Sequence, residues 1–133
     1  MEDSLMFELS DYRMKRARET LADAKSLLER DRVESSINRS YYAIFHALRA
    51  VTALDGFDSS KHSGIIAHFN QMYVKAGIFD KEISKLIRIA FSTREKADYD
   101  DFAEVTYEMA EEQVAAAEKV ISAVECYLES KRE

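Results

Sequence analysis

The sequence predicts an all-α fold, an antiparallel up-and-down bundle of four to five helices. Three observations lead to this prediction. The chain of 133 residues has no proline and only three glycines, a composition that permits long helices and offers little for hairpins. Apolar residues recur at intervals of three and four, the spacing of one helix face. The segments that carry this spacing are joined by short stretches, so neighbouring helices should run antiparallel within one domain over residues 1–133.

The first helix is expected from about Ser10 to Arg30, with the preceding residues as an extension of it. Its apolar row consists of Met14, Ala17, Leu21, Ala24 and Leu28. The segment Asp31–Glu34 then has the form of a capping box, with an acceptor at the N-cap and a glutamate three residues later. This box should start a central helix that runs to about Leu54. Asp55-Gly56 should end it, because glycine suits the left-handed position after a helix.

The central helix carries three stripes over residues 35–52. The first stripe has small side chains: Ser36, Ser40, Ala43, Ala47 and Ala50. The second has bulky ones: Ile37, Tyr41, Ile44, Leu48 and Val51. The third is polar: Ser35, Arg39, Tyr42, His46 and Arg49. A helix with two apolar stripes is buried over most of its circumference, so this helix should lie at the centre of the bundle.

The polar stripe of the central helix has two interpretations. Burying arginines, a tyrosine and a histidine costs free energy unless they are paired or face a wet groove. One interpretation is a satisfied polar network at a bundle seam or dimer interface, and the other is a site for a nucleotide or RNA. Under the first interpretation, His46 should be largely buried and hydrogen-bonded, with Arg39 or Tyr42 nearby.

The next helix should begin after a loop at residues 57–61, with Ser59 or Ser60 as its cap. It should end at Gly77. Its inward face is expected to carry Ile66, Phe69, Tyr73 and Ala76.

Asp80 should cap the following helix, which is expected to fade over residues 92–97. Its inward residues are Ile83, Leu86, Ile87, Ala90 and Phe91. An acidic turn at residues 98–101 follows, and Asp101 with Glu104 offers another capping box. The last helix is long, with a regular apolar row of Ala110, Val114, Ala117, Ile121, Val124 and Leu128. The two shorter helices should together form one broken rod of the bundle.

Charge is distributed unevenly along the chain. Nine acidic and three basic residues lie between Asp101 and Glu133, so this segment alone accounts for the net charge of −6. A globally basic nucleic-acid footprint is therefore absent, and any RNA contact must be local. The segment Lys81–Lys96 is one basic candidate, although a solvated helix face explains it equally well.

Several classes of protein are excluded by the sequence. No acid cluster and no His or Cys pair has metal-ligand spacing, so neither a metal site nor a cofactor is expected. No apolar run is long enough to cross a bilayer and no signal peptide opens the chain. The single Cys126 favours a reducing cytoplasm and lies on an apolar row, where a small core or seam residue is expected.

Three segments carry a resemblance to a known family. They are SYYAIFHALRA at residues 40–50, KHSG at residues 61–64 and REKADYDD at residues 94–101. In this order they resemble the HEPN superfamily (higher eukaryotes and prokaryotes nucleotide-binding domain), in particular its small stand-alone prokaryotic members. The resemblance implies an up-and-down helical bundle that commonly dimerises. It also implies a minimal nucleotidyltransferase as partner, in a toxin–antitoxin pair.

The resemblance also implies roles for individual residues. Active HEPN ribonucleases carry an arginine followed after four to six residues by histidine, usually at the start of the final long helix. Here that place holds Arg94 with Asp98 and Tyr99, and no histidine follows. Tyr99 corresponds to a tyrosine that the partner enzyme can modify with AMP. Arg39 and His46 have the ribonuclease spacing, but on the second helix.

The sequence therefore leaves three hypotheses for function. The first is a module that binds a nucleotide, or a nucleotidyltransferase partner, in a toxin–antitoxin-like pair. Its ligand-binding candidates are Arg39, Tyr42, His46, Arg49, Arg94, Asp98 and Tyr99. The second is a metal-independent endoribonuclease toxin, with Arg39 holding the scissile phosphate and His46 transferring protons. The third is a structural helical dimer without a ligand. A homodimer is expected in each case, because two apolar stripes exceed what a three-rod monomer covers.

Overall fold

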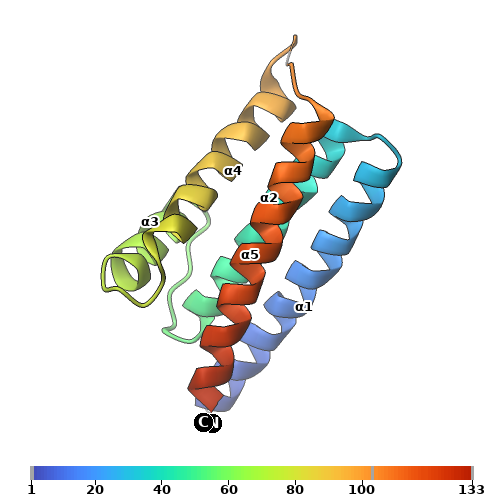
Figure 1. The fold of residues 1–133 in the computed structure, drawn as a ribbon. Coiled ribbons are helices and arrows are strands. Elements are labelled where there is room, and N and C mark those ends of the chain that lie inside the picture. Colours follow the sequence, from blue (N-terminus) through green and yellow to red (C-terminus); the bar gives the residue numbers. More distant parts are fainter. Residues whose placement is uncertain (1, 103, 133) are drawn as a thin grey trace.

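The computed structural model describes residues 2–102 and 104–132, and every regular element among them is helical. The elements are α1 (Glu2–Glu29), α2 (Val33–Ala53), α3 (His62–Phe69), η1 (Asn70–Val74), α4 (Lys81–Tyr99) and α5 (Tyr107–Arg132). Three long rods, α1, α2 and α5, lie side by side (Figure 1). The predicted all-α bundle of four to five helices is thus confirmed.

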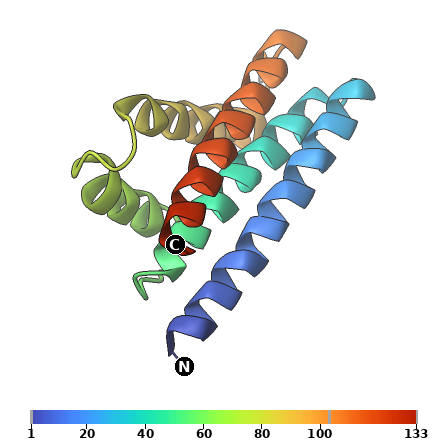
Figure 2. The same cartoon turned by 60° about the horizontal axis from the view of Figure 1, so that its bottom comes forward.

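α2 lies at the centre of this arrangement. It packs against α1, α3, α4 and α5. Both views place α1 on one side of the α2 and α5 pair and the shorter α3 and α4 on the other (Figure 2). All ten residues of the small and bulky stripes of α2 are buried, as the periodicity predicts. The residues of the polar stripe stay partly or fully accessible.

The turn between α1 and α2 differs from the predicted capping box. Asp31 has a φ of 59°, and α2 begins at Val33 with Arg32 at the N-cap and no side-chain cap. The backbone N–H of Arg32 donates to Leu27 O (2.9 Å) and that of Asp31 to Leu28 O (3.0 Å). This pair of bonds is a Schellman motif that ends α1, with Asp31 in the left-handed position. Asp31 therefore terminates one helix instead of starting the next.

The end of α2 follows the prediction. Gly56 has a φ of 76°, and the N–H of Phe57 donates to Thr52 O (3.2 Å). Asp55 then ties this turn to the following element, because its Oδ2 accepts a hydrogen bond from the Tyr73 hydroxyl (2.6 Å).

α3 begins at His62 with Lys61 at its N-cap, so the predicted caps Ser59 and Ser60 are wrong. The helix continues into η1, where Lys75 N–H donates to Asn70 O (2.8 Å) across a π-helical turn. Ile65, Phe69 and Tyr73 are buried. Ala76, predicted to face inward, lies in the turn after η1 and is exposed, so the prediction for this residue is wrong.

α4 and α5 each differ from the prediction at one end. Asp80 caps α4 as expected, its side chain accepting from Glu82 N–H (2.8 Å). The helix does not fade after residue 92 but continues to Tyr99. α5 starts only at Tyr107, and Thr106 caps it by accepting from Met109 N–H (3.1 Å), so the predicted box at Asp101 and Glu104 is wrong.

The apolar row of α5 is buried throughout, as predicted. Cys126 is exposed, so its expected place in the core is wrong. No helix among the described residues is both long enough and apolar enough to cross a membrane.

Candidate functional site

Arg94 of α4 is buried beneath aromatic rings. The residue is only 6% exposed, and its guanidinium carbon lies 4.5 Å from the ring centroid of Tyr41 and 5.8 Å from that of Tyr42. Tyr99 approaches from the end of the same helix, with its ring centroid at 5.9 Å. The Arg94 Nη1 atom also lies 3.6 Å from Asp98 Oδ2. A cation placed over ring faces and beside a carboxylate is stabilised despite its burial.

Arg39 extends this cluster towards solvent. Its Nε and Nη2 atoms donate to Asn38 Oδ1 (3.0 and 2.6 Å), and its guanidinium lies 5.0 Å from the Tyr42 ring centroid. Asn38 in turn donates to Asp98 Oδ2 (2.9 Å). Among the described side chains, no carboxylate forms an ion pair with Arg39. Its charge is therefore available to an anion.

The structure thus brings together five of the seven predicted ligand-binding residues at one end of α2. We call this group the α2–α4 surface; it consists of Arg39, Tyr42, Arg94, Asp98 and Tyr99. An open cavity of about 470 Å³ lies at this surface, and its lining residues are Leu27, Glu34, Ser35, Asn38, Arg39, Ala97 and Asp98. Tyr99 is 68% exposed, so its ring and hydroxyl are accessible.

His46 does not have the predicted environment. It is half-buried, and it makes no hydrogen bond to the part of the chain that the structure describes. Burial, together with the charges of Arg16, Arg49, Arg39 and Arg13, lowers its pKa to about 4. The expected hydrogen-bonded histidine is therefore wrong; His46 is a neutral imidazole among arginines at pH 7.

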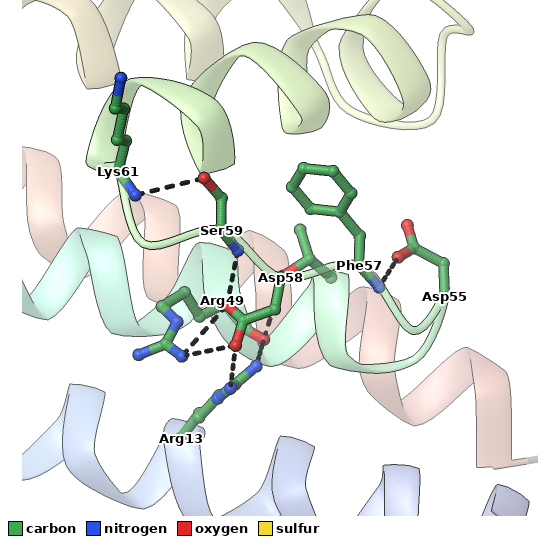
Figure 3. A network of polar contacts seen from close by, with 8 residues as sticks. Arg13, Arg49, Asp55, Phe57, Asp58, Ser59 and Lys61 are labelled. Atoms are coloured by element: carbon green, nitrogen blue, oxygen red, sulfur yellow. Dashed lines mark hydrogen bonds and ion pairs between the residues drawn. The ribbon is translucent and has the colours of Figure 1, made fainter.

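Arg49 also lies apart from the α2–α4 surface. It turns towards the loop before α3, where its Nη2 lies 3.3 Å from Asp58 Oδ1 (Figure 3). Arg13 of α1 approaches the same carboxylate, with its Nη2 3.7 Å from Asp58 Oδ2.

His62 is a residue of the site that sequence reasoning missed. Its Nδ1 lies 2.9 Å from the Tyr41 hydroxyl, and its ring stacks on Phe45 with centroids 3.9 Å apart. Burial and the charges of Arg94 and Arg49 lower its pKa. The KHSG segment was the available signal, but Tyr41 and His62 are 21 positions apart in the sequence, too far for any periodicity to indicate their contact.

Gly64 in that segment fits closely against the preceding loop. A Cβ atom at this position would lie 3.0 Å from Ser59 Cβ and closer still to Ser59 Oγ. We expect Gly64→Ala to lower the free energy of unfolding by roughly 1–3 kcal/mol, since the loop or α3 must shift. Urea denaturation measures this loss. The double variant Gly64→Ala with Ser59→Gly should recover most of the stability, and equal loss in both variants would contradict the proposed clash.

No group of three or more His, Cys, Asp or Glu residues that could hold a metal ion occurs among the described residues.

Comparison with known proteins places this site in a family context. The family model described as "HEPN domain" matches residues 10–127. A "UPF0332 protein" of Thermotoga maritima is 38% identical over 122 residues, covering 92% of each chain. A Methanocaldococcus jannaschii protein named "Putative toxin MJ0605" is 34% identical over 83 residues, covering 62% of each chain.

A solved structure has the same fold. The crystal structure of TT1696 from Thermus thermophilus superimposes with a TM-score of 0.74, covering 87% of this chain and 95% of that one. The sequence identity is 18%, so this likeness concerns the fold alone.

Proposed function

The chain belongs to the HEPN domain family, and we propose that it is a toxin-like module that binds a nucleotide through the α2–α4 surface. Two relatives from Methanocaldococcus jannaschii bear the names "Putative toxin MJ0605" and "Putative toxin MJ0142". The observation that carries the proposal is the state of Arg39, a guanidinium held over Tyr42 without a carboxylate partner among the described side chains. Arginine binds phosphate oxygens bidentately, and exposed aromatic rings stack on nucleobases. Arg39 would therefore hold the phosphates, and Tyr99 would contact the base.

The two proposed partners would use different surfaces. A minimal nucleotidyltransferase would reach the hydroxyl of Tyr99, which is exposed next to Arg94. A second copy of the chain would cover the outer face of α1, where Leu5, Leu9 and Tyr12 are 65%, 42% and 56% exposed. Exposed apolar side chains at this helical spacing favour an interface.

Binding fits this geometry better than RNA cleavage. A ribonuclease that used Arg39 and His46 would need one group to donate a proton and another to accept it. With a pKa of about 4, His46 can accept a proton at pH 7 but holds none to donate. The Arg39 guanidinium is meanwhile directed to Asn38 and Tyr42, not to His46.

We expect ATP to bind the protein in isothermal titration, and Arg39→Ala to weaken that binding at least tenfold. The loss corresponds to about 1.4 kcal/mol, the lower end of what hydrogen bonds to a charged group contribute. The matched control is Arg18→Ala, because Arg18 lies on α1 and pairs with Glu125 of α5, away from the surface. The proposal is overturned if the parent protein does not bind ATP, or if the Arg39 and Arg18 variants bind it equally.

A further inference from the structure

A second cavity lies where the C-terminal half of α2 meets the loop before α3. Its volume is about 520 Å³, and it is lined by Phe45, Arg49, Asp58, Ser59, Ser60 and His62. Arg49 is ten residues beyond Arg39 on α2, which corresponds to roughly 15 Å along the helix axis. We call this cavity the α2–α3 cavity; it has its own arginine and adjoins the α2–α4 surface at His62, whose ring centroid lies 5.6 Å from that of Tyr42.

Two arginines share the Asp58 carboxylate: Arg49 lines the cavity, whereas Arg13 of α1 is buried next to it. Asp58 lies between Arg13 and Arg49 (Figure 3), with ion-pair distances of 3.7 and 3.3 Å. The arginine side chains are 10% and 28% exposed, whereas the Asp58 side chain is 58% exposed. The Nε atom of Arg49 is buried and has no hydrogen-bond partner among the described residues. Asp58 Oδ1 also accepts a hydrogen bond from the Ser59 backbone N–H (2.9 Å), but its contacts with the two arginines are long, and the arginine pair retains one uncompensated positive charge.

Other donors surround the same space. His62 is held in place by the Tyr41 hydroxyl and by its stacking on Phe45. α3 starts at His62 without a side-chain cap, so its first backbone N–H groups have no side-chain acceptor. Ser59 and Ser60 add hydroxyl groups to the lining. An anion in the cavity would therefore meet guanidinium, imidazole and hydroxyl donors together.

We propose that the α2–α3 cavity binds a phosphate monoester dianion, and that Asp58 is an internal anion that occupies its arginines when no ligand is bound. The charges distinguish monoesters from diesters. A monoester carries nearly two negative charges at pH 7 and balances Arg13 and Arg49 together. A diester carries one negative charge, which balances the arginines no better than the single charge of Asp58 already does.

Substitutions of Arg49 and Asp58 should change the affinity for a phosphate monoester in opposite directions. Arg49→Ala removes one of the two guanidinium groups, so monoester affinity should fall at least tenfold. Asp58→Asn removes the competing carboxylate and should raise the affinity about three- to tenfold. Both side chains are partly exposed and make only long contacts with each other, which makes either variant compatible with folding.

The test is an NMR titration of the ¹⁵N-labelled protein with methyl phosphate, and with dimethyl phosphate as the singly charged comparison. We expect saturable shifts of the Ser59, Ser60 and His62 amides with methyl phosphate, and at least tenfold weaker binding of dimethyl phosphate. Arg18→Ala is the control for loss of an arginine elsewhere. AMP and a 5′-phosphorylated trinucleotide, each against its dephosphorylated form, distinguish a free nucleotide from the end of a strand.

Several results would overturn the proposal that the α2–α3 cavity binds a phosphate monoester. They are equal affinity for the two phosphates, unchanged methyl phosphate binding in Arg49→Ala, or no gain in Asp58→Asn. Shifts confined to Asn38, Arg39 and Tyr99 would also reject it, while leaving the nucleotide proposal for the α2–α4 surface intact. Conversely, Arg39→Ala tests that surface without changing any residue of the α2–α3 cavity.

Discussion

Replacing Arg94 by alanine is expected to lower the free energy of unfolding by about 2–4 kcal/mol. Arg94 is 6% exposed and lies over the rings of Tyr41, Tyr42, Phe91 and Tyr99. Truncation would leave a cavity under these rings and remove the cation–π interactions. It would also release Asp98, although that side chain is partly exposed and can be solvated. Urea denaturation followed by circular dichroism measures the change.

Two further variants show why Arg94 matters. Arg88→Ala, on the exposed face of the same helix, should change stability by no more than about 0.5 kcal/mol. Arg94→Met keeps an unbranched side chain without the charge, so it should recover about half of the loss if packing and charge contribute similarly. A melt of Arg94→Ala that coincides with that of the parent would contradict a structural role for this arginine.

The parts of the fold that follow from periodicity were predictable. The stripes of α2 and the apolar row of α5 repeat at three and four over many residues, and their burial follows from that repeat. The Arg94 and Asp98 pair also follows from helix geometry, because side chains four residues apart meet on a helix.

Local turn chemistry was less predictable, because the same residue type serves two purposes. Aspartate is favoured both at an N-cap and in the left-handed position after a helix. The chain turns sharply between α1 and α2, and Asp31 takes the left-handed position after α1 instead of the N-cap of α2. The π-helical turn in η1 leaves no mark in the apolar pattern, and the spacing of three that predicts a buried Ala76 continues past Val74, where η1 ends and the turn begins.

The candidate site depends on contacts between distant segments, which periodicity does not report. Periodicity assigns Tyr41 to the core stripe but cannot say that its hydroxyl reaches His62 or that its ring supports Arg94. The protonation of His46 depends in the same way on Arg13 and Arg16, which come from another helix.

Stability should accordingly fall as the pH is lowered from about 7 to 4.5, with His46 as a principal cause. Burial and nearby arginines lower the His46 pKa from 6.5 to about 4 in the folded protein. The unfolded chain therefore binds more protons in this interval, and the free energy of unfolding must decrease with decreasing pH. Without screening by solvent, a pKa shift of this size corresponds to a loss of roughly 3 kcal/mol in the free energy of unfolding. Because His46 is only half-buried, we expect about 1–2 kcal/mol.

The measurement compares urea denaturation of the parent and of His46→Gln at pH 7.5 and 4.5. Glutamine is polar and does not titrate, so this variant should lose about 1–2 kcal/mol less on acidification than the parent does. The pKa of His62 is also lowered, but His62 is present in both proteins, so its effect on stability cancels when the two pH-dependent losses are compared. The interval ends above the range in which Asp58 titrates, since its backbone hydrogen bond and the nearby arginines lower its pKa. Parallel pH profiles for the two proteins would mean that His46 is protonated as easily in the folded chain as in the unfolded one, against the arginine environment described for it.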